Sequence, residues 1–543
     1  MKIFKLFSRS ENSTLSAAFI LMISLLIANL LGLLKLRIYA YLFQGASSDL
    51  GIFLASDRIP NFVFNVLAIG ALSTSFIPVF SQNIAQGRKD RAFALASTLF
   101  NLSFVIFAFA AILFFVFSRH ILGLFSWGGD LTGGETELLN LSSRILFLAQ
   151  LFFLFSAFSS GILQSFGYFT AVAASPVVFN LAVIIFTILL APRFGILGAS
   201  WATVIGALCH FLVQVPTLVS AGFLYKPVIN LKDKLLAEIG RLFIPRTFSL
   251  VVDQLAALLL TSFSLSLSAS SVVIFSFAQR LELIPVALFG SALAQASFAP
   301  LSKSAEGSGP EFVSIFKKTF YYLSFLILPS SVFLMVLRIP LVRIFFGSRG
   351  FDWPATLLTA HTLSLFAIGI FFQAQSGLLA RSFFALKNTR VPLISSLVSL
   401  ILGSVLAYVS LHFWHWNVWG LALAASFIDL VDFTILYLLL AKRFPEIISA
   451  NFIKPVFLMA AAALTSGLVS FVLVRQLDFR FSFFDTRHFI NLISLTMVSL
   501  LFGGSTYLLI SYKLGINEGK KVIRWISRLK NFGPAFLSGI FQE

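Results

Sequence analysis

The sequence predicts an all-α polytopic membrane protein, with about 14 transmembrane helices in two pseudo-symmetric six-helix lobes plus two extra C-terminal helices. Composition is the first reason: of 543 residues, 58% are hydrophobic and 11% are charged, and the mean hydropathy is +0.96. The second reason is that long apolar stretches recur along the chain, and the third is an internal repeat. A soluble domain has about a quarter of its residues charged, so this composition excludes a soluble globular protein.

The apolar stretches are long enough to cross the hydrocarbon layer, which takes about 20 residues of helix. The first stretch follows Lys2, Lys5 and Arg9 and is too long for a cleaved signal peptide, so we expect it to be retained. Charged residues, proline and glycine in the first, second and tenth spans predict bent helices that face a cavity. The expected spans lie at about 16–42, 51–82, 92–118, 140–164, 168–191, 196–221, 243–267, 270–300, 314–337, 355–381, 391–412, 417–441, 453–474 and 489–512.

The charge of the chain is strongly positive: 39 Lys and Arg against 21 Asp and Glu give a formal net charge of +18. Most of these cations fall at the two ends of the chain and in the alternate loops on the same side. Cytoplasmic loops are enriched in Lys and Arg, so we predict a multi-pass protein of the bacterial cytoplasmic (inner) membrane with both termini cytoplasmic. The excess then indicates contact with anionic membrane lipids, not with nucleic acid.

The last segment, 513–543, reads as a basic amphipathic cytoplasmic tail. Apolar residues at 522, 523, 526 and 529 fall on one face of a helix, and lysines and arginines surround them. Such a helix suits the surface of an anionic leaflet, and a solvated basic tail is the alternative.

An internal repeat divides the chain. Arg58 and Arg280 lie 222 residues apart, and the same spacing relates Ser-Phe-x-Pro at 75–78 to 297–300 and Gly198 to Gly420. Six helices per copy is an even number, so both copies have the same orientation, as in transporters whose substrate site lies between the halves. The predicted organisation is an N-lobe at 1–236 with helices 1–6, a C-lobe at 237–448 with helices 7–12, helices 13–14 at 449–512, and the tail.

Cations inside the spans are the candidate site, because an ionisable group in a membrane is costly and marks a pathway or binding site by default. Arg280 lies near the middle of the eighth span, and Arg58 is its repeat partner. Lys35 and Arg37 lie in the first span, and Arg246 begins the seventh. Arginine suits phosphate because its planar fork forms bidentate, charge-assisted hydrogen bonds. For Arg58 and Arg246, an interfacial position is the competing interpretation.

The remaining polar residues indicate no catalytic site. Asp429 and Asp432 share a helix face, where either a proton or Na⁺ site or a structural hydrogen bond would account for them. His412 and His415 lie among tryptophans, which favours aromatic packing in an outer loop. The sequence has no nucleotide-binding loop, no catalytic triad order, no metal-ligand spacing, and a single cysteine, Cys209. We therefore expect a protein that is not an enzyme, has no cofactor and no bound metal, and is driven by the membrane potential or an ion gradient.

Short motifs running in order from the first helix to the twelfth carry a family resemblance. They are LLGLLK at 30–35, IPN at 59–61, GALSTSFIPV at 70–79, SPVVFN at 175–180, GILGASWA at 195–202, LVQVP at 212–216, AQRL at 278–281, PVALFG at 285–290, LARSFFALKNTRVP at 379–392 and GLALAAS at 420–426. With them the chain resembles the MurJ (MviN) lipid II flippases of the multidrug/oligosaccharidyl-lipid/polysaccharide (MOP) exporter superfamily.

The resemblance implies fourteen helices, a cationic cavity between two lobes, alternating access, and an undecaprenyl-diphosphate-linked peptidoglycan precursor as substrate. It also implies roles for single residues. Arg280 matches the essential arginine of the family's eighth helix, Lys35 matches a first-helix arginine, Asp49 matches the acid after that helix, and Arg246 matches the Pro-Arg that begins the seventh.

The chain departs from the family pattern in its second helix. Phe64 and Asn65 occupy the places of two arginines, and Ile69 occupies that of a glutamate. We hypothesise that Arg58 supplies the missing charge from about two turns earlier.

Taken together, the sequence predicts a flippase that moves lipid II, a polyprenyl-diphosphate glycan, from the inner to the outer leaflet by alternating access. A flippase for another polyprenyl-diphosphate polysaccharide is the first alternative. A multidrug antiporter and a non-transporting membrane scaffold follow, and the oligomeric state is open.

Overall fold

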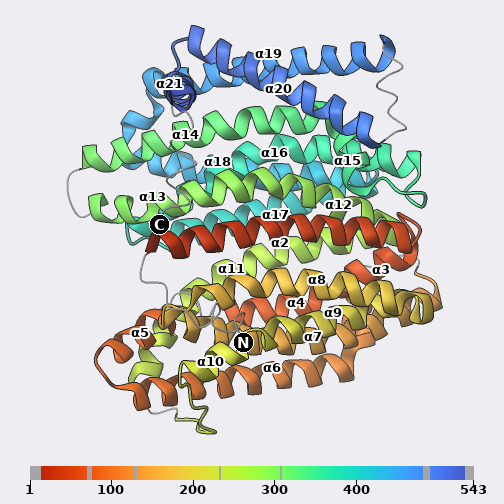
Figure 1. The fold of residues 1–543 in the computed structure, drawn as a ribbon, viewed down its shortest axis with the longest axis vertical. Helices are drawn as coiled ribbons and strands as arrows, with labels where there is room; N and C mark the ends of the chain where they lie inside the picture. Colours follow the sequence, from red (N-terminus) through yellow and green to blue (C-terminus); the bar gives the residue numbers. More distant parts are fainter. Residues whose placement is uncertain are drawn as a thin grey trace. The chain divides into compact units, whose positions relative to one another are not determined.

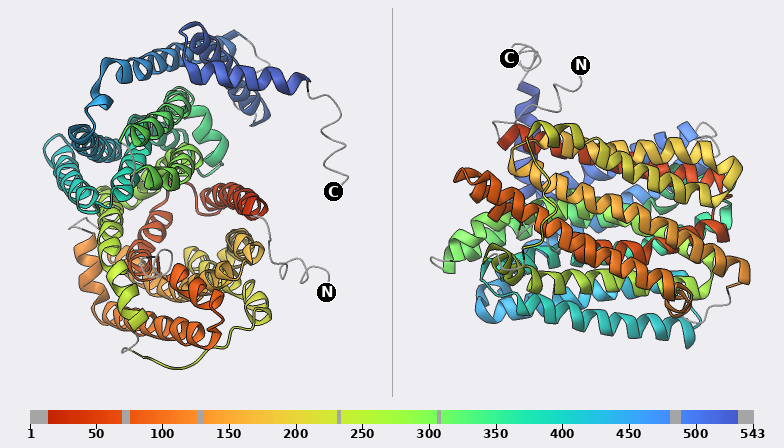
Figure 2. Two further views of the ribbon diagram at one scale, coloured as in Figure 1. Left: turned by 90° about the vertical axis from the view of Figure 1, so that its left-hand side faces the viewer. Right: turned by 90° about the horizontal axis from the view of Figure 1, so that it is seen from below.

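The computed structural model describes residues 14–69, 76–126, 131–230, 234–305, 309–480 and 489–531, and these residues form helices without a β-strand. Contacts between Cα atoms divide the chain into two units. Unit 1 comprises Met1–Phe277, Phe345–Ala355 and Ala407–Leu421, and unit 2 comprises Ala278–Ile344, Thr356–Leu406 and Ala422–Glu543. In each unit, long helices run side by side (Figures 1 and 2).

The helices follow one another through short connections. The first helices along the chain are α2 (Thr14–Leu42), α3 (Ser48–Ser56), α4 (Arg58–Phe64), η1 (Asn65–Ile69), α5 (Ile77–Ala85), α6 (Lys89–Phe125), α7 (Gly133–Ser165), α8 (Phe169–Phe194), α9 (Ile196–Leu212), α10 (Val215–Ser220), α11 (Lys234–Leu267) and α12 (Ala269–Pro285). Helix α12 begins in unit 1 and ends in unit 2. The others are η3 (Val286–Ser291), α13 (Ala292–Ala305), α14 (Gly309–Val336), α15 (Arg338–Phe346), α16 (Trp353–Ala385), α17 (Arg390–His412), α18 (Val418–Arg443), η4 (Pro445–Ile448), α19 (Ala450–Arg480), α20 (Phe489–Lys513) and α21 (Asn517–Asn531).

The structure confirms an all-α fold whose helices coincide with the predicted spans. Among the described residues, 12 helices are long and apolar enough to cross a membrane. The two other predicted spans, 51–82 and 243–267, are also helical: the first is divided into α3, α4, η1 and α5, and the second lies in α11. Within α11, the stretch Val251–Leu267, whose side chains the structure describes, is apolar.

Of the three spans predicted to bend, only the second is broken. Its break lies at Asp57, three residues before Pro60. A proline ring clashes with the carbonyl group four residues earlier, here that of Ser56, so one helix ends there and another begins. The first and tenth spans form the continuous helices α2 and α16, and a bend within them stays a prediction.

The helices reproduce the internal repeat. The π-helical turns η1 (Asn65–Ile69) and η3 (Val286–Ser291) coincide when the chain is shifted by the spacing of Arg58 and Arg280. Under the same shift α8 falls on α17, and α9 and α10 fall on α18. The partition of the chain at 236 and 448 stays a prediction, because contacts group α11 with the first six helices of the sequence.

The repeat extends to helix packing at two glycines. A Cβ atom at Gly198 would lie 2.8 Å from the backbone of Leu190 on α8, and one at its repeat partner Gly420 would lie 3.1 Å from Ser410 Oγ on α17. Small residues let membrane helices approach closely. Both hairpins therefore depend on a glycine at the same place in the repeat.

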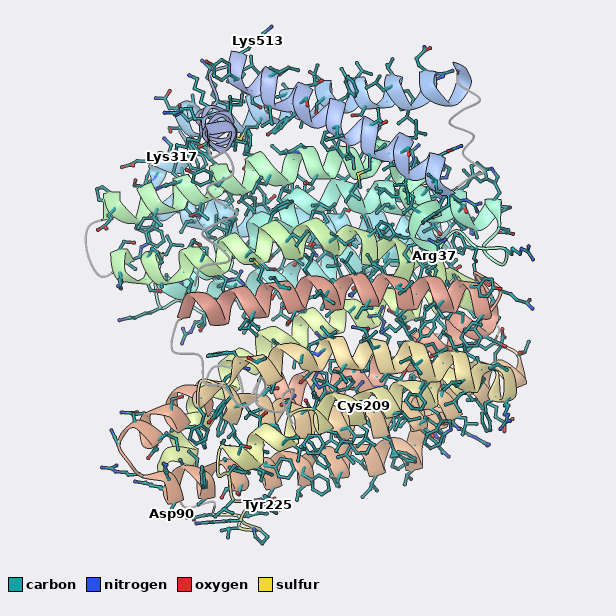
Figure 3. All side chains as sticks on the ribbon, viewed as in Figure 1. Arg37, Asp90, Cys209, Tyr225, Lys317 and Lys513 are labelled. Atoms are coloured by element: carbon teal, nitrogen blue, oxygen red, sulfur yellow. The ribbon has the colours of Figure 1, made fainter. Side chains whose placement is uncertain are left out.

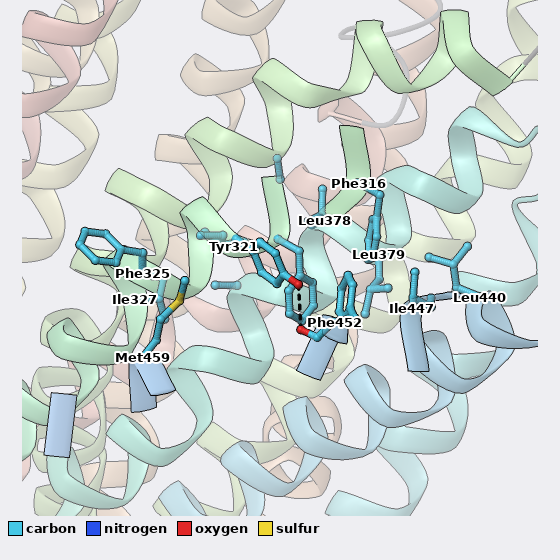
Figure 4. Packing of buried hydrophobic residues seen from close by; sticks show 14 of the residues in the cluster. Phe316, Tyr321, Phe325, Ile327, Leu378, Leu379, Leu440, Ile447, Phe452 and Met459 are labelled. Atoms are coloured by element: carbon cyan, nitrogen blue, oxygen red, sulfur yellow. Dashed lines mark hydrogen bonds between the residues drawn. The ribbon is translucent and has the colours of Figure 1, made fainter. Parts of the chain in front are cut away.

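The core of unit 2 is aromatic and apolar (Figure 4). Tyr321 Oη donates to the carbonyl oxygen of Phe452 at 2.9 Å, and Tyr507 Oη donates to that of Phe325 at 2.9 Å. These bonds join α14 to α19 and α20, because a buried phenol needs a partner. The two additional C-terminal helices are thus part of unit 2 and of its core.

The predicted tail forms helix α21, which packs on α14 and α20. Val522 contacts the unit 2 core, Glu518 is buried, and Lys521 Nζ donates to Tyr322 Oη at 2.9 Å. Lys521 and Arg524 are exposed. Residues 532–543 and the side chains of 525–531, which include the predicted apolar positions 526 and 529, lie outside the described part.

Candidate functional site

The break in the second span brings a carboxylate to two cations within unit 1. Asp57 lies between α3 and α4, and its Oδ1 accepts a hydrogen bond from Gln150 Nε2 on α7 at 3.2 Å. Asp57 interacts electrostatically with Arg58, its neighbour in the chain, and with Lys35 on α2. A charged group removed from water needs such compensation, and the three residues form a partly buried charge cluster. We call Lys35, Asp57, Arg58 and Gln150 the Asp57 cluster.

Lys35 is held by an aromatic ring as well as by charge. Its Nζ lies 5.0 Å from the centroid of Phe179 on α8, and a cation over an aromatic face is favourable when water is excluded. Arg37 is partly buried on the same helix, towards the end that leads into α3 (Figure 3).

Arg280 lies on α12 in unit 2 and is partly buried. Glu282 follows it by two positions and is only 3% exposed. Residues two apart point to different sides of a helix, so Glu282 serves a different surface of α12. There it interacts electrostatically with Asp429 on α18. Arg280 and Glu282 therefore do not form a simple local ion pair along α12.

Two more predicted site residues, Asp49 and Arg246, lie on α3 and α11. Asp49 is exposed in the first turn of α3, where Ser47 caps the helix by accepting a hydrogen bond from Leu50 N at 3.3 Å. An acid in the first turn is favourable beside the helix dipole. Arg246 lies within α11, and its side chain is outside the described part.

Phe64 and Asn65, at the positions where the family pattern has arginines, contact uncharged side chains. The ring of Phe64 packs on that of Phe153 with centroids 6.0 Å apart, and Asn65 Nδ2 donates to Gln254 Oε1 at 3.3 Å. Arg58 is thus the cation that α4 contributes, at its first residue.

The structure gives contacts for two other groups of polar residues that the sequence singled out, the acids of α18 and the histidines near the end of α17. Asp432 Oδ1 accepts a hydrogen bond from Ser395 Oγ on α17 at 2.6 Å, as a structural role requires, and a proton or Na⁺ site at Asp429 and Asp432 stays a prediction. In the loop after α17, Trp416 lies 4.7 Å from both Trp414 and Trp419, and His412 stacks on Tyr408 at 4.2 Å, so aromatic packing is present but His412 packs on a tyrosine and not on a tryptophan. Within the described ranges, no three His, Cys, Asp or Glu side chains converge as metal ligands.

The sequence alone indicated neither the role of Gln150 nor the proximity of the like-charged Glu282 and Asp429. Gln150 is one of few amide side chains in a long apolar helix, and an isolated polar residue of this kind could have been singled out from the sequence. No pattern in one helix, however, indicates which neighbouring helix its polar group faces.

Comparisons with known proteins agree with this fold. A family model described as lipid II flippase MurJ matches residues 39–499. A probable lipid II flippase MurJ of Bdellovibrio bacteriovorus is 26% identical over 521 residues, covering 95% of this chain and 97% of the relative. One from Vibrio cholerae is 27% identical over 503 residues, covering 90% of this chain and 94% of the relative.

Solved structures show the same architecture. An inward-closed lipid II flippase MurJ matches with a TM-score of 0.74 at 21% identity, covering 91% of this chain and 98% of that one. An inward-facing multidrug resistance MATE transporter of the MOP superfamily matches with a TM-score of 0.64 at 15% identity, covering 79% and 98%. With these matches, the fold is that of a multi-pass membrane transporter of the MOP type, not an enzyme. Within that class, the chain belongs to the MurJ family of lipid II flippases.

Proposed function

We propose that this protein moves lipid II, the polyprenyl-diphosphate-linked peptidoglycan precursor, from the inner to the outer leaflet by alternating access. The observation that carries the proposal is the family match over 39–499. It is supported by cations at repeat-equivalent positions, Arg58 and Arg280, which suit a diphosphate.

The proposed binding residues for the diphosphate are Arg280 from one copy of the repeat and Arg58 with Lys35 from the other. Arg37 and Arg246 are further candidates, and Asp49 is proposed to act at the end of the first helix. An arginine fork forms paired, charge-assisted hydrogen bonds to phosphate oxygens. Contact with both copies of the repeat gives the substrate a means to change conformation, since a ligand shifts an equilibrium only by binding the two states differently.

The Asp57 cluster supplies a reason why cations are tolerated before substrate arrives. Asp57 compensates Arg58 and Lys35, and an entering diphosphate would take over that compensation. No cofactor is proposed. The membrane potential or an ion gradient would drive the cycle, and a potential of 100 mV supplies about 2.3 kcal/mol per elementary charge moved.

A second candidate function is transport of another polyprenyl-diphosphate polysaccharide. This candidate is supported because Phe64 and Asn65 make uncharged contacts at positions where the family pattern has arginines, so this chain differs from the family pattern there. Both candidates share the diphosphate, so the glycan distinguishes them.

Depletion of the protein tests the proposal. In a cell without a second flippase, we expect lipid II exposed on the outer leaflet to fall several-fold while total lipid II rises, because synthesis continues inside. The measurement is chemical or enzymatic labelling of outer-leaflet lipid II. Unchanged exposure would contradict the proposal, and loss of another surface glycan instead would support the second candidate.

The proposed location is the bacterial inner membrane with both termini cytoplasmic, and anionic lipids are the proposed partners of the basic face of α21. Reporter fusions after residues 225, 340 and 512 are expected to read inside, outside and inside, because lysines and arginines concentrate on one side. A phosphatase and a fluorescent protein, fused in parallel, give opposite signals at each point. A reversed order would overturn the orientation.

A further inference from the structure

Unit 1 has an apolar hollow of about 300 Å³ where α6 and α7 meet the end of α9 and the chain that follows it. Phenylalanines and one tyrosine form most of its wall: Phe100, Phe155, Phe158, Phe211, Phe223 and Tyr225. Their rings contact one another, with Phe100 5.4 Å from Phe155 and 5.9 Å from Tyr225. The wall is therefore an ordered aromatic surface, which we call the α6–α7 groove.

Part of the groove wall comes from Phe223 and Tyr225 of the non-helical segment 223–230, which is hydrogen-bonded to α6. Lys226 N donates to Ser97 Oγ at 3.0 Å, and Asn101 Nδ2 donates to the carbonyl oxygen of Val228 at 3.0 Å. Tyr225 Oη donates to Asn101 Oδ1 at 2.6 Å while its ring lines the groove. A tyrosine with an apolar ring and a bonded hydroxyl is typical of a membrane–water interface.

The rim beside this segment is cationic. Lys226 Nζ lies 3.1 Å from Asp90 Oδ1, and the two side chains are 38% and 96% exposed. Arg88, Lys89 and Arg91 surround Asp90 in the sequence, so positive charge exceeds negative at this point. Asp90 and Tyr225 lie at the end of unit 1 away from Arg37 (Figure 3), which is the end that carries the basic loops.

A second hollow offers a comparison within the same helix pair. It has a volume of about 390 Å³ and is lined by apolar residues of α6 and α7 only, among them Phe107, Ile112 and Phe147. None of its lining residues is charged. Beside the second hollow lies one cation, Arg144, whose guanidinium is 5.6 Å from the ring of Phe115 in its wall. The α6–α7 groove differs in having several exposed cations near its rim, Lys226 and those around Asp90.

We propose that the α6–α7 groove binds an anionic phospholipid, with an acyl chain against the phenylalanines and the phosphate at Lys226 and the start of α6. An acyl chain gains little by leaving surrounding lipid for an apolar groove, so head-group charge must supply the selectivity. A hollow of this volume is too small for a helix, whose diameter with side chains is about 10 Å. None of the residues that line the groove is among those proposed for the diphosphate, and none belongs to α21.

Lipid binding to the full-length purified protein tests the site. Mass spectrometry of the intact protein would count bound dioleoyl phosphatidylglycerol and dioleoyl phosphatidylcholine added in equal amounts. We expect phosphatidylglycerol to bind preferentially. Lys226→Gln should weaken it about fivefold, equivalent to about 1 kcal/mol for one interfacial lysine, and leave phosphatidylcholine unchanged. Leu218→Trp, at a partly exposed wall position, should reduce both lipids.

Matched controls separate this site from general effects. Ile112→Trp fills the second hollow, and Arg524→Gln removes a cation from α21, and both should bind phosphatidylglycerol as the parent does. Leu218→Ala keeps the groove open and should also bind normally, which covers the case in which the tryptophan variant misfolds. Equal binding of the two lipids by the parent, or parental binding by Lys226→Gln, would overturn the proposal. The assay contains no lipid II, so its failure is independent of transport.

Discussion

Arg280→Ala is expected to abolish transport: the variant, produced at the parental level, should fail to support growth of a strain depleted of its own flippase. Two charge-assisted hydrogen bonds to the diphosphate would be lost, each worth about 1.5–3 kcal/mol. That corresponds to at least about a hundredfold in affinity. Because substrate binding must also shift the conformational equilibrium, the loss affects both loading and turnover.

Two further variants distinguish the loss of the arginine fork from the loss of positive charge and from a general effect of removing an arginine. Arg280→Lys keeps the positive charge but not the planar fork, so we expect partial complementation. Arg193→Ala removes an exposed arginine at the end of α8 and should behave as the parent. Complementation by Arg280→Ala equal to the parent would remove Arg280 from the site, even though membership of the family would stand.

Asp57→Ala is expected to lower the stability of the protein and to impair transport. It leaves Lys35 and Arg58 without the acid that compensates them and Gln150 Nε2 without its acceptor. Removing one partner of a buried ion pair costs about 3–5 kcal/mol, and we expect the lower end because Asp57 is partly buried. The measurement is the unfolding temperature of the purified protein, followed by loss of the monodisperse peak after heating.

The pattern across related variants identifies the cause. Asp57→Asn keeps an acceptor for Gln150 but not the charge, so its stability should be intermediate. The double variant Asp57→Ala/Arg58→Ala should recover part of the lost stability, although Arg58→Ala itself is expected to impair transport. Asp90→Ala, which removes an exposed acid paired with Lys226, should cost about 1 kcal/mol or less. An Asp57→Ala protein as stable as the parent would show that the cluster is not a compensated charge site.

Some elements were predictable because their cause is local. Pro60 and the apolar run around it define where the second span is helical, and Pro60 also accounts for the break at Asp57. Arg58 and Arg280 stand out because each is a charge in an apolar stretch, and their common spacing with Gly198 and Gly420 shows the repeat. By contrast, Asp49 has the family's spacing but is exposed at a helix start, since sequence distance from a helix end does not fix which way a side chain faces.

The sequence by itself determined that this protein crosses a membrane many times, belongs to a repeated transporter architecture and carries arginines inside its spans. Each of these follows from residue type and spacing along one chain, which hydropathy and charge record directly. Only the tertiary structure decided that Gln150 bonds Asp57, that Glu282 faces Asp429, and that the segment 223–230 completes an aromatic groove on α6. In a chain apolar on nearly every helix face, the helix that each face meets depends on packing between segments far apart in sequence, and hydropathy does not encode it.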